Sequence, residues 1–141
     1  MVSWIKALAA TVGGIIAYLW GPWDALIIAL IVCVAVGYIT GLIKGWCKKE
    51  LSSEIGFKGL AKKVIIFGLV ALASMIDKVI PAANQAIRAA VIMFYIANEG
   101  LSILENAGEL GLPLPVKLKN ALKSMKTQSG EKNEETKEEE E

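Results

Sequence analysis

Residues 25–43 read ALIIALIVCVAVGYITGLI, nineteen residues without a single formal charge. As an α-helix, nineteen residues extend for about 28 Å at about 1.5 Å per residue, close to the roughly 30 Å thickness of the hydrocarbon core of a bilayer. A buried helix of a soluble domain rarely runs this long without a polar face. This stretch therefore predicts a helix that crosses a membrane.

The composition of the whole chain points the same way. Of its 141 residues, 55% are hydrophobic, and the mean hydropathy is +0.51. A soluble domain of this length would be more polar, because hydrated side chains must cover its core. We therefore expect an all-α integral membrane protein whose main partner is the lipid bilayer.

Three further apolar segments accompany the central one. Together they predict about four hydrophobic helices in two hairpins, at residues 4–20, 23–43, 60–80 and 86–108. Gly21-Pro22 breaks the first pair, and Pro81 breaks the second. The last two segments contain charged residues, so the alternative is that they dip into the membrane or lie on its surface.

Lysines indicate which loops face the cytoplasm. They form two clusters, one after the central helix and one after residue 109: Lys44, Lys48, Lys49, Lys58, Lys62 and Lys63, and then Lys117, Lys119, Lys123 and Lys126. By the positive-inside rule both clusters are cytoplasmic, so an even number of crossings separates them. Either the last two segments both span the membrane or neither does. We favour four spans, with residues 1–112 as the membrane domain and residues 113–141 as a cytoplasmic tail, basic and then acidic.

The last fifteen residues, TQSGEKNEETKEEEE from Thr127 onward, hold seven Glu, two Lys and no hydrophobic residue. Such a segment cannot bury enough surface to offset its ordering entropy, so we expect it to be disordered. The formal net charge of +1 hides this asymmetry, because the rest of the chain has an excess of positive charge. That excess suits an anionic cytoplasmic leaflet.

Residue types that carry catalysis or ligand binding are scarce. The chain has no His, which removes the usual general base and most kinds of zinc site. Cys33 and Cys47 lie fourteen residues apart on one expected helix. That spacing is about 21 Å, too far for a disulfide. We expect no enzyme activity, cofactor, metal site, nucleic-acid binding or small-molecule substrate.

Small residues recur at every fourth position of the central helix. The series is Ala25, Ala29, Cys33, Gly37, Gly41 and Gly45, and the last five are our candidates for helix packing and oligomerisation. Lipid supplies no hydrophobic force between helices, so association depends on close backbone approach along such faces. The series predicts packing within one chain or between the copies of a homo-oligomer, and the two uses are equally open.

Polar residues form a stripe near the end of the fourth segment. At 100° per residue they fall on one side of a helix: Asn98, Glu99, Ser102, Glu105, Asn106 and Glu109. A polar face within a membrane must meet protein, water or the headgroup layer. It either lines an aqueous lumen once several copies assemble, or it floats at the membrane surface.

The stretch from Ile96 to Lys123, IANEGLSILENAGELGLPLPVKLKNALK, closely resembles the signature region of the toxin-secretion/phage-lysis holin family. The resemblance is carried by Asn98-Glu99, Ser102, Glu105-Asn106, Gly108, Gly111-x-Pro113-x-Pro115 and Leu118-Lys119. It covers about a fifth of the chain closely, while the preceding apolar segments match in character and order only.

The resemblance implies a bacteriophage or prophage holin. Such a protein accumulates in the bacterial cytoplasmic membrane, forms homo-oligomers and opens holes at a timed threshold. Through the holes an endolysin reaches the cell wall, and some relatives are implicated in the release of protein toxins. Holins are usually described with two or three spans, so four would exceed the family pattern.

Two other classes of protein fit the same sequence features. A small ion or solute channel would use the polar stripe around a narrow pore. A membrane-anchored adaptor would use the acidic tail to recruit a cytosolic partner. Passage of a folded reporter protein separates a holin from both. A channel passes ions but not the reporter, and an adaptor passes neither ions nor the reporter.

Overall fold

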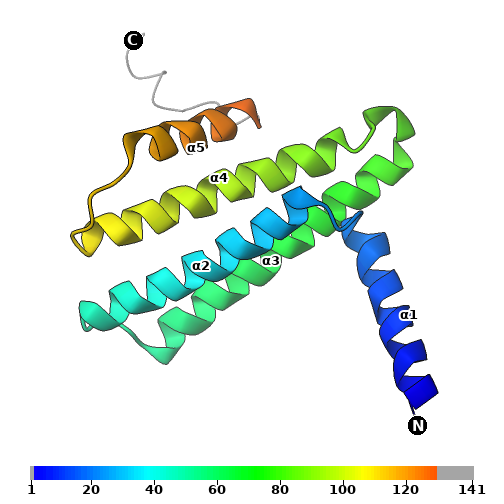
Figure 1. The fold of residues 1–141 in the computed structure, drawn as a ribbon, viewed down its shortest axis with the longest axis horizontal. Coiled ribbons are helices and arrows are strands. Elements are labelled where there is room, and N and C mark those ends of the chain that lie inside the picture. The colour runs from blue at the N-terminus through cyan, green and yellow to red at the C-terminus, as the bar shows by residue number, and fades with distance from the viewer. Residues whose placement is uncertain (1, 130–141) are drawn as a thin grey trace.

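The computed structural model describes residues 2–129, and all of its regular structure is helical (Figure 1). The five α-helices and one short 3₁₀ helix are α1 (Val2–Trp20), α2 (Ala25–Cys47), α3 (Ser53–Val79), η1 (Pro81–Ala83), α4 (Ala86–Glu109) and α5 (Val116–Gln128). The expectation of an all-α protein is confirmed. Helices α1 to α4 are each long and apolar enough to cross a membrane, which confirms the expectation of four such segments.

The boundaries follow local signals in the sequence. Asp24 caps α2 through its side chain, which accepts a hydrogen bond from the backbone nitrogen of Ile27 at 3.1 Å. The hydroxyl of Ser52 caps α3 in the same way. Because of this cap, α3 begins seven residues before the expected start at residue 60, and part of the first lysine cluster is helical. Pro81 ends the helical run after α3, as expected.

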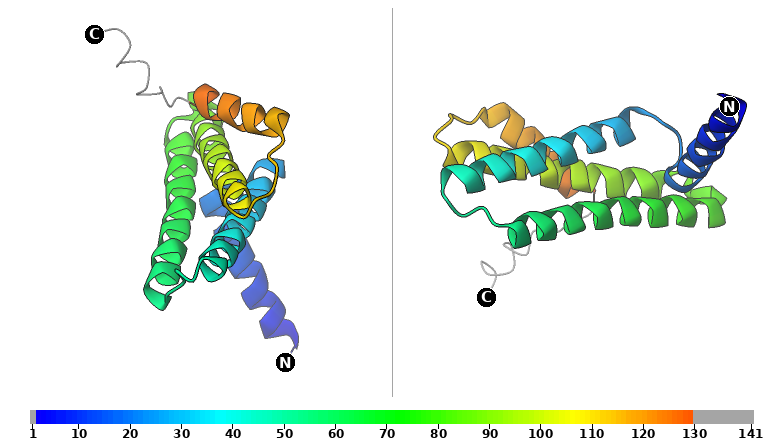
Figure 2. Two further views of the ribbon diagram at one scale, coloured as in Figure 1. Left: turned by 90° about the vertical axis from the view of Figure 1, so that its left-hand side faces the viewer. Right: turned by 90° about the horizontal axis from the view of Figure 1, so that it is seen from below.

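Helices α2, α3 and α4 form a bundle whose members lie side by side in each view (Figures 1 and 2). Its core consists of aliphatic side chains from all three helices: Ile27, Leu30, Val34, Ile66, Val70, Ile92 and Ile96. Most other large apolar side chains point outward, which suits a protein that meets lipid rather than water.

Helix α1 diverges from the bundle instead of lying along α2 (Figure 1). The expected break is present, and Gly21 makes it with a φ of +80°, a conformation that favours glycine. No side chain of α1 is buried, and Gly13 has no neighbouring atom within 4 Å of where a Cβ would lie. The contacts of α1 are near its end, where the Trp20 indole donates to the Phe67 carbonyl at 2.8 Å.

The expected tail begins with a helix. Helix α5 turns back and lies beside α4, on the side away from α2 (Figure 1). The acidic tail was expected to be disordered from Thr127, but Thr127 and Gln128 belong to the last turn of α5. The remainder of that prediction concerns residues 130–141, which lie outside the described part of the chain.

Candidate functional site

Polar side chains inside the bundle follow the seam between α2 and α4. They gather at three levels, one at each end and one between. Buried charge is costly in a membrane protein and marks function or specific pairing. The three levels are therefore the candidate site.

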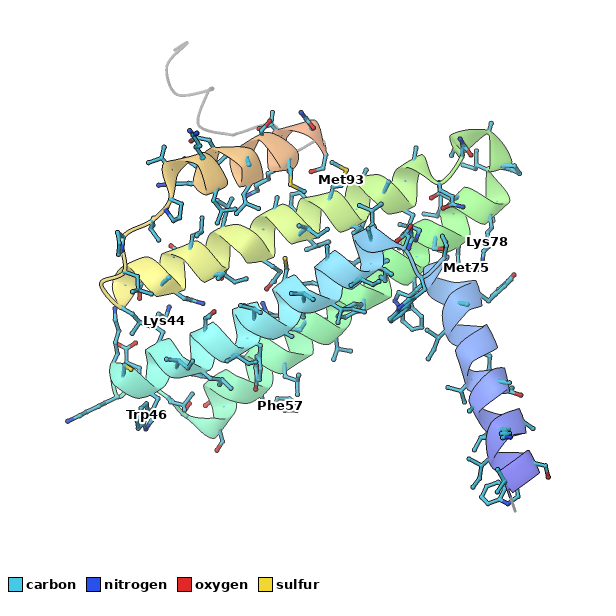
Figure 3. The ribbon with its side chains drawn as sticks, viewed as in Figure 1. Lys44, Trp46, Phe57, Met75, Lys78 and Met93 are labelled. Atoms are coloured by element: carbon cyan, nitrogen blue, oxygen red, sulfur yellow. The ribbon has the colours of Figure 1, made fainter. Side chains whose placement is uncertain are left out.

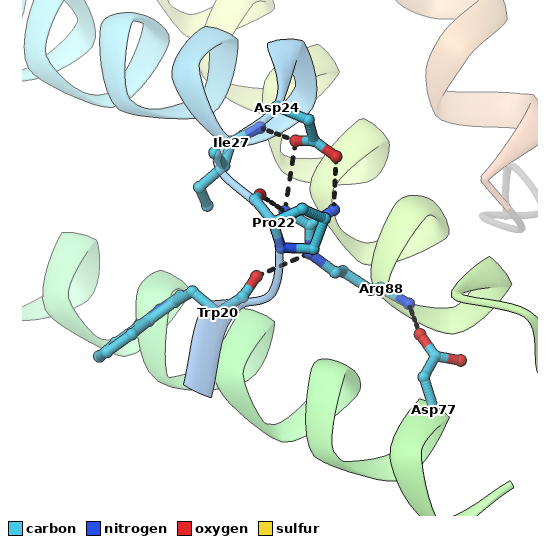
Figure 4. A network of polar contacts seen from close by, with 6 residues as sticks. All are labelled: Trp20, Pro22, Asp24, Ile27, Asp77 and Arg88. Carbon is cyan, nitrogen blue, oxygen red and sulfur yellow. Dashed lines mark hydrogen bonds and ion pairs between the residues drawn. The ribbon is translucent and has the colours of Figure 1, made fainter. Parts of the chain in front are cut away.

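Arg88 organises one end of the bundle (Figure 4). Its side chain is only 2% exposed, the most buried charged group among the described residues. The guanidinium donates to Asp24 at 2.9 Å, to the Trp20 carbonyl at 2.7 Å and to the Pro22 carbonyl at 2.9 Å. Arg88 of α4 thereby holds the turn that joins α1 to α2.

Asp77 ties α3 to the same end. Its carboxylate accepts hydrogen bonds from the backbone nitrogens of Ile87 and Arg88, at 3.2 and 2.7 Å. These are donors of the first turn of α4, which have no partner within the helix. A carboxylate is also favoured there by the helix dipole. We call Arg88, Asp24 and Asp77 the end clamp.

Arg88 lowers the pKa of Asp24. The hydrogen bond from Arg88 holds the pKa of Asp24 below its ordinary value of 3.8, and this outweighs the opposing effect of partial burial. Asp24 is therefore a carboxylate at neutral pH, and the pair carries no net charge.

Glu99 and Lys63 form the second level. Glu99 is 4% exposed, and its carboxylate pairs with the ammonium of Lys63 from α3. A Cβ at residue 37 would lie 2.7 Å from Oε2 of Glu99, so Gly37 leaves the space that this carboxylate occupies. The buried charge is thus neutralised within the chain, at a point where α2, α3 and α4 meet.

Asn106 and Glu109 link α4 to the end of α2. Asn106 is buried and donates from Nδ2 to the Thr40 hydroxyl at 3.0 Å. Glu109 lies 2.9 Å from Lys48 and 3.5 Å from Lys44. Lys44 lies between the ends of α2 and α4 in Figure 3. The hydrogen bond to Glu109 raises the pKa of Lys48. These contacts place the carboxyl ends of α2 and α4 at the same end of the bundle.

The predicted polar stripe divides in two on this scaffold. Glu99 and Asn106 turn toward α2 and α3, while Ser102 borders a cavity between α2 and α3 together with Asn106. Asn98 and Glu105 are exposed, and neither forms a hydrogen bond or ion pair with another of residues 2–129. The stripe is one face of the helix, but only Asn98 and Glu105, which we call the polar flank of α4, remain exposed and unpaired among the described residues.

Two of the small residues of α2, Gly37 and Gly41, lie against α4. Gly37 is buried and Ala29, Cys33, Gly41 and Gly45 are half-buried. A Cβ at residue 41 would make ordinary contact with Asn106, at 3.8 Å, and one at residue 45 would touch Leu51. Within this single chain Gly37 and Gly41 meet side chains of α4. The use of the whole series for packing and for contacts between copies stays a prediction.

Sequence reasoning missed the roles of Arg88, Asp24, Asp77, Lys63 and Thr40. The available signal was a charged residue inside an apolar helix, which marks a position that needs a partner. Which residue supplies the partner depends on how the helices pack. No group of three or more Cys, Asp or Glu side chains among residues 2–129 could hold a metal ion.

The chain is similar in sequence to known proteins. Residues 14–127 match the model of the bacteriophage holin family. An uncharacterized 14.9 kDa protein from the nagH 3′ region of Clostridium perfringens is 40% identical over 89% of this chain and 95% of its own length. An uncharacterized protein of Listeria monocytogenes is 44% identical over 86% of each chain.

A probable holin of Bacillus phage phi105 is 36% identical over 84% of this chain and 86% of its own length. No solved structure matches the chain. The family match covers most of the chain: the last seven residues of α1, the whole of α2, α3 and α4, and nearly all of α5. The chain is therefore a multi-pass membrane protein and belongs to the bacteriophage holin family.

Proposed function

We propose that this protein is a holin that assembles in the bacterial cytoplasmic membrane and opens holes at a set time. The cargo is an endolysin that reaches the cell wall, or a protein toxin. Membership of the holin family supports the class of function. The exposed polar flank of α4 supports the mechanism.

The observation that carries the mechanism is the pair Asn98 and Glu105. Both lie on a helix that is apolar enough to span a membrane, and both are exposed after Glu99, Asn106 and Glu109 have found partners in the chain. A carboxylate facing hydrocarbon costs roughly 2.5–3.5 kcal/mol even on lenient insertion scales. Several copies that turn this flank toward one another remove the cost by lining an aqueous lumen.

The proposed topology has four spans and a cytoplasmic C-terminus. The pairing of Lys48 with Glu109 supports it, because it brings the end of α2, in the first lysine cluster, next to the end of α4, from which the chain leads to the second cluster. The opposite end holds the clamp around Arg88 and has far fewer lysines. The positive-inside rule then assigns the lysine-rich end to the cytoplasm.

The test is induction of the protein in bacteria while membrane potential and passage of a folded cytosolic reporter are followed together. A holin loses the potential and passes the reporter. Loss of potential without passage would indicate an ion channel, and loss of neither would indicate an adaptor. Either of these outcomes would overturn the proposal.

Two variants connect the hole to the polar flank. Glu105→Leu removes a carboxylate from the proposed lumen and lowers the free-energy cost of placing α4 in lipid. Oligomers should therefore still form, while reporter release should fall at least several-fold. Glu54→Leu is the matched control, because Glu54 is exposed in the first turn of α3 at the lysine-rich end. It should release the reporter as the parent does.

A further inference from the structure

Helix α5 has two unlike sides. One edge is apolar and is formed by Leu118, Leu122 and Met125, at helical spacing. The remainder carries four lysines: Lys117, Lys119, Lys123 and Lys126. A basic amphipathic helix of this kind suits an anionic membrane surface.

In the structure part of this apolar edge, centred on Leu122, lies on α4 instead. Leu122 is buried over Gly100, where a Cβ would lie 2.9 Å from the leucine methyl carbons. Leu114, just before α5, packs over Gly108 in the same way, at 3.3 Å. The ammonium of Lys126 lies 5.9 Å from the centre of the Phe94 ring. Helix α5 runs antiparallel to α4 (Figure 1). Together with Leu114 it covers α4 from Gly108 back to Phe94.

This arrangement conflicts with a fully inserted α4. Gly108 and Phe94 are fourteen residues apart, about 21 Å along a helix. That distance exceeds half of the roughly 30 Å hydrocarbon core. If α4 spans the bilayer, a docked α5 carries exposed lysines such as Lys119 and Lys123 into hydrocarbon, where charged side chains are strongly disfavoured.

Helix α5 lies along α4 but adds little to the buried core. Leu122 is its one buried side chain, and Val116 and Leu118 are exposed. The connection from α4 contains Gly111 at a φ of +87°, followed by two prolines and no regular structure. No helix therefore continues from α4 into α5.

We propose that α5 is a detachable basic helix, which docks on the Gly100–Gly108 face of α4 and transfers to the anionic headgroups of the adjoining leaflet when α4 spans the bilayer. The proposal rests on the four-span topology of the proposed function. Charge complementarity identifies the partner: four lysines on one short helix fit a surface of anionic lipid.

A disulfide trap tests the docking. Gly100→Cys and Leu122→Cys are combined in the full chain with Cys33→Ala and Cys47→Ala, since both natural cysteines are free thiols. We expect efficient oxidative cross-linking in zwitterionic detergent and at least a five-fold lower yield in vesicles that contain phosphatidylglycerol. An equal yield in those vesicles, or no cross-link in detergent, would overturn the proposal.

The matched control is the pair Thr40→Cys and Asn106→Cys, whose parent side chains are in contact between α2 and α4. It should cross-link equally in detergent and in vesicles, which shows that the bundle stays intact while α5 leaves. Inorganic phosphate added in detergent should not lower the yield of the Gly100–Leu122 pair. A fall there would assign the lysines to free phosphate and contradict the leaflet as partner.

A second variant isolates the lysines. All four lysines of α5 are replaced with Gln in the chain that carries Gly100→Cys and Leu122→Cys. The cross-linking yield in the anionic vesicles should then rise at least two-fold, because the leaflet no longer attracts α5. No change would contradict the role of the charges. Cross-linking is read without any hole, so these results stand apart from reporter release, which tests the proposed function by itself.

Discussion

At Arg88 a permanently charged side chain lies in the first turns of an apolar helix, and its contacts explain how the chain accommodates it. The guanidinium reaches one carboxylate and two backbone carbonyls that have no helical partner. A fork of donors in fixed geometry suits this task better than a single ammonium. The residue fastens three chain segments at the end of the bundle that is poor in lysine.

The first prediction concerns this residue. Arg88→Leu removes the guanidinium hydrogen bonds to Asp24 and to the Trp20 and Pro22 carbonyls. The free energy of unfolding should therefore fall by about 2–4 kcal/mol, somewhat less than for a fully buried pair because Asp24 is partly exposed. Unfolding of the detergent-solubilised protein by SDS, followed by tryptophan fluorescence, measures it. Arg88→Lys keeps the charge without the fork and should recover only part of the loss. A Leu variant as stable as the parent would mean that the clamp is not formed.

The second prediction concerns pH. The pKa of Asp24 is lower in the folded protein than its ordinary value of 3.8, so the unfolded chain binds a proton more readily. The clamp therefore contributes its full stability above pH 4, and this contribution is lost as the pH falls through the folded pKa below that. Unfolding curves from pH 7 to pH 3 measure the slope. Asp24→Asn should remove the part of the acid sensitivity that comes from this carboxyl; an unchanged slope would contradict the pairing.

At the scale of helices, the packing of α2 on α4 depends on where side chains are absent. The backbone of α2 at Gly37 leaves space for the Glu99 carboxylate, and Gly41 lies next to Asn106. By contrast Gly68 of α3 and Gly13 of α1 have no neighbour within 4 Å of a Cβ. Glycine therefore has a packing role at some positions of this bundle and none at others.

This contrast yields the third prediction. Gly37→Leu forces α2 and α4 apart and disturbs the Lys63–Glu99 pair, so it should cost on the order of 1–3 kcal/mol, as overpacking typically does. Gly68→Leu introduces the same side chain at an open position and should cost less than about 0.5 kcal/mol. The two variants are compared in the same SDS titration. Equal effects would show that α2 does not approach α4 at Gly37.

How far the sequence predicts these elements depends on the kind of signal each one has. Helix α2 is evident because an uncharged run of this length has few alternatives, and the breaks at Gly21-Pro22 and Pro81 are local backbone effects. Helix α5 escapes the same reasoning, because it is short and polar and its apolar edge is defined by what it covers on α4. The partner of Arg88 could not be predicted either, since Asp24 lies 64 positions away in the sequence and meets it only through packing.

For the whole molecule, the proposed topology places the lysine-rich end of the bundle in the cytoplasm. The fourth prediction tests it with Cys47, which is exposed, and with an engineered Ser129→Cys in a Cys47→Ala background. Both thiols should be shielded from a membrane-impermeant reagent added to intact cells before lysis and should react after the cells are broken. Trp23→Cys, in the turn at the opposite end, should react in intact cells. Labelling of Cys47 from outside would reverse the assignment.

The central claim is that Asn98 and Glu105 face water in the assembled hole, and their accessibility tests it most directly. Asn98→Cys and Glu105→Cys are each placed in a chain without its natural cysteines, and an impermeant thiol reagent is added before and after the onset of reporter release. Leu69→Cys, on the apolar groove between α3 and α4, is the control that should stay protected. We predict that both flank positions become labelled when release begins. Release of the reporter while both remain as protected as Leu69→Cys would contradict the account.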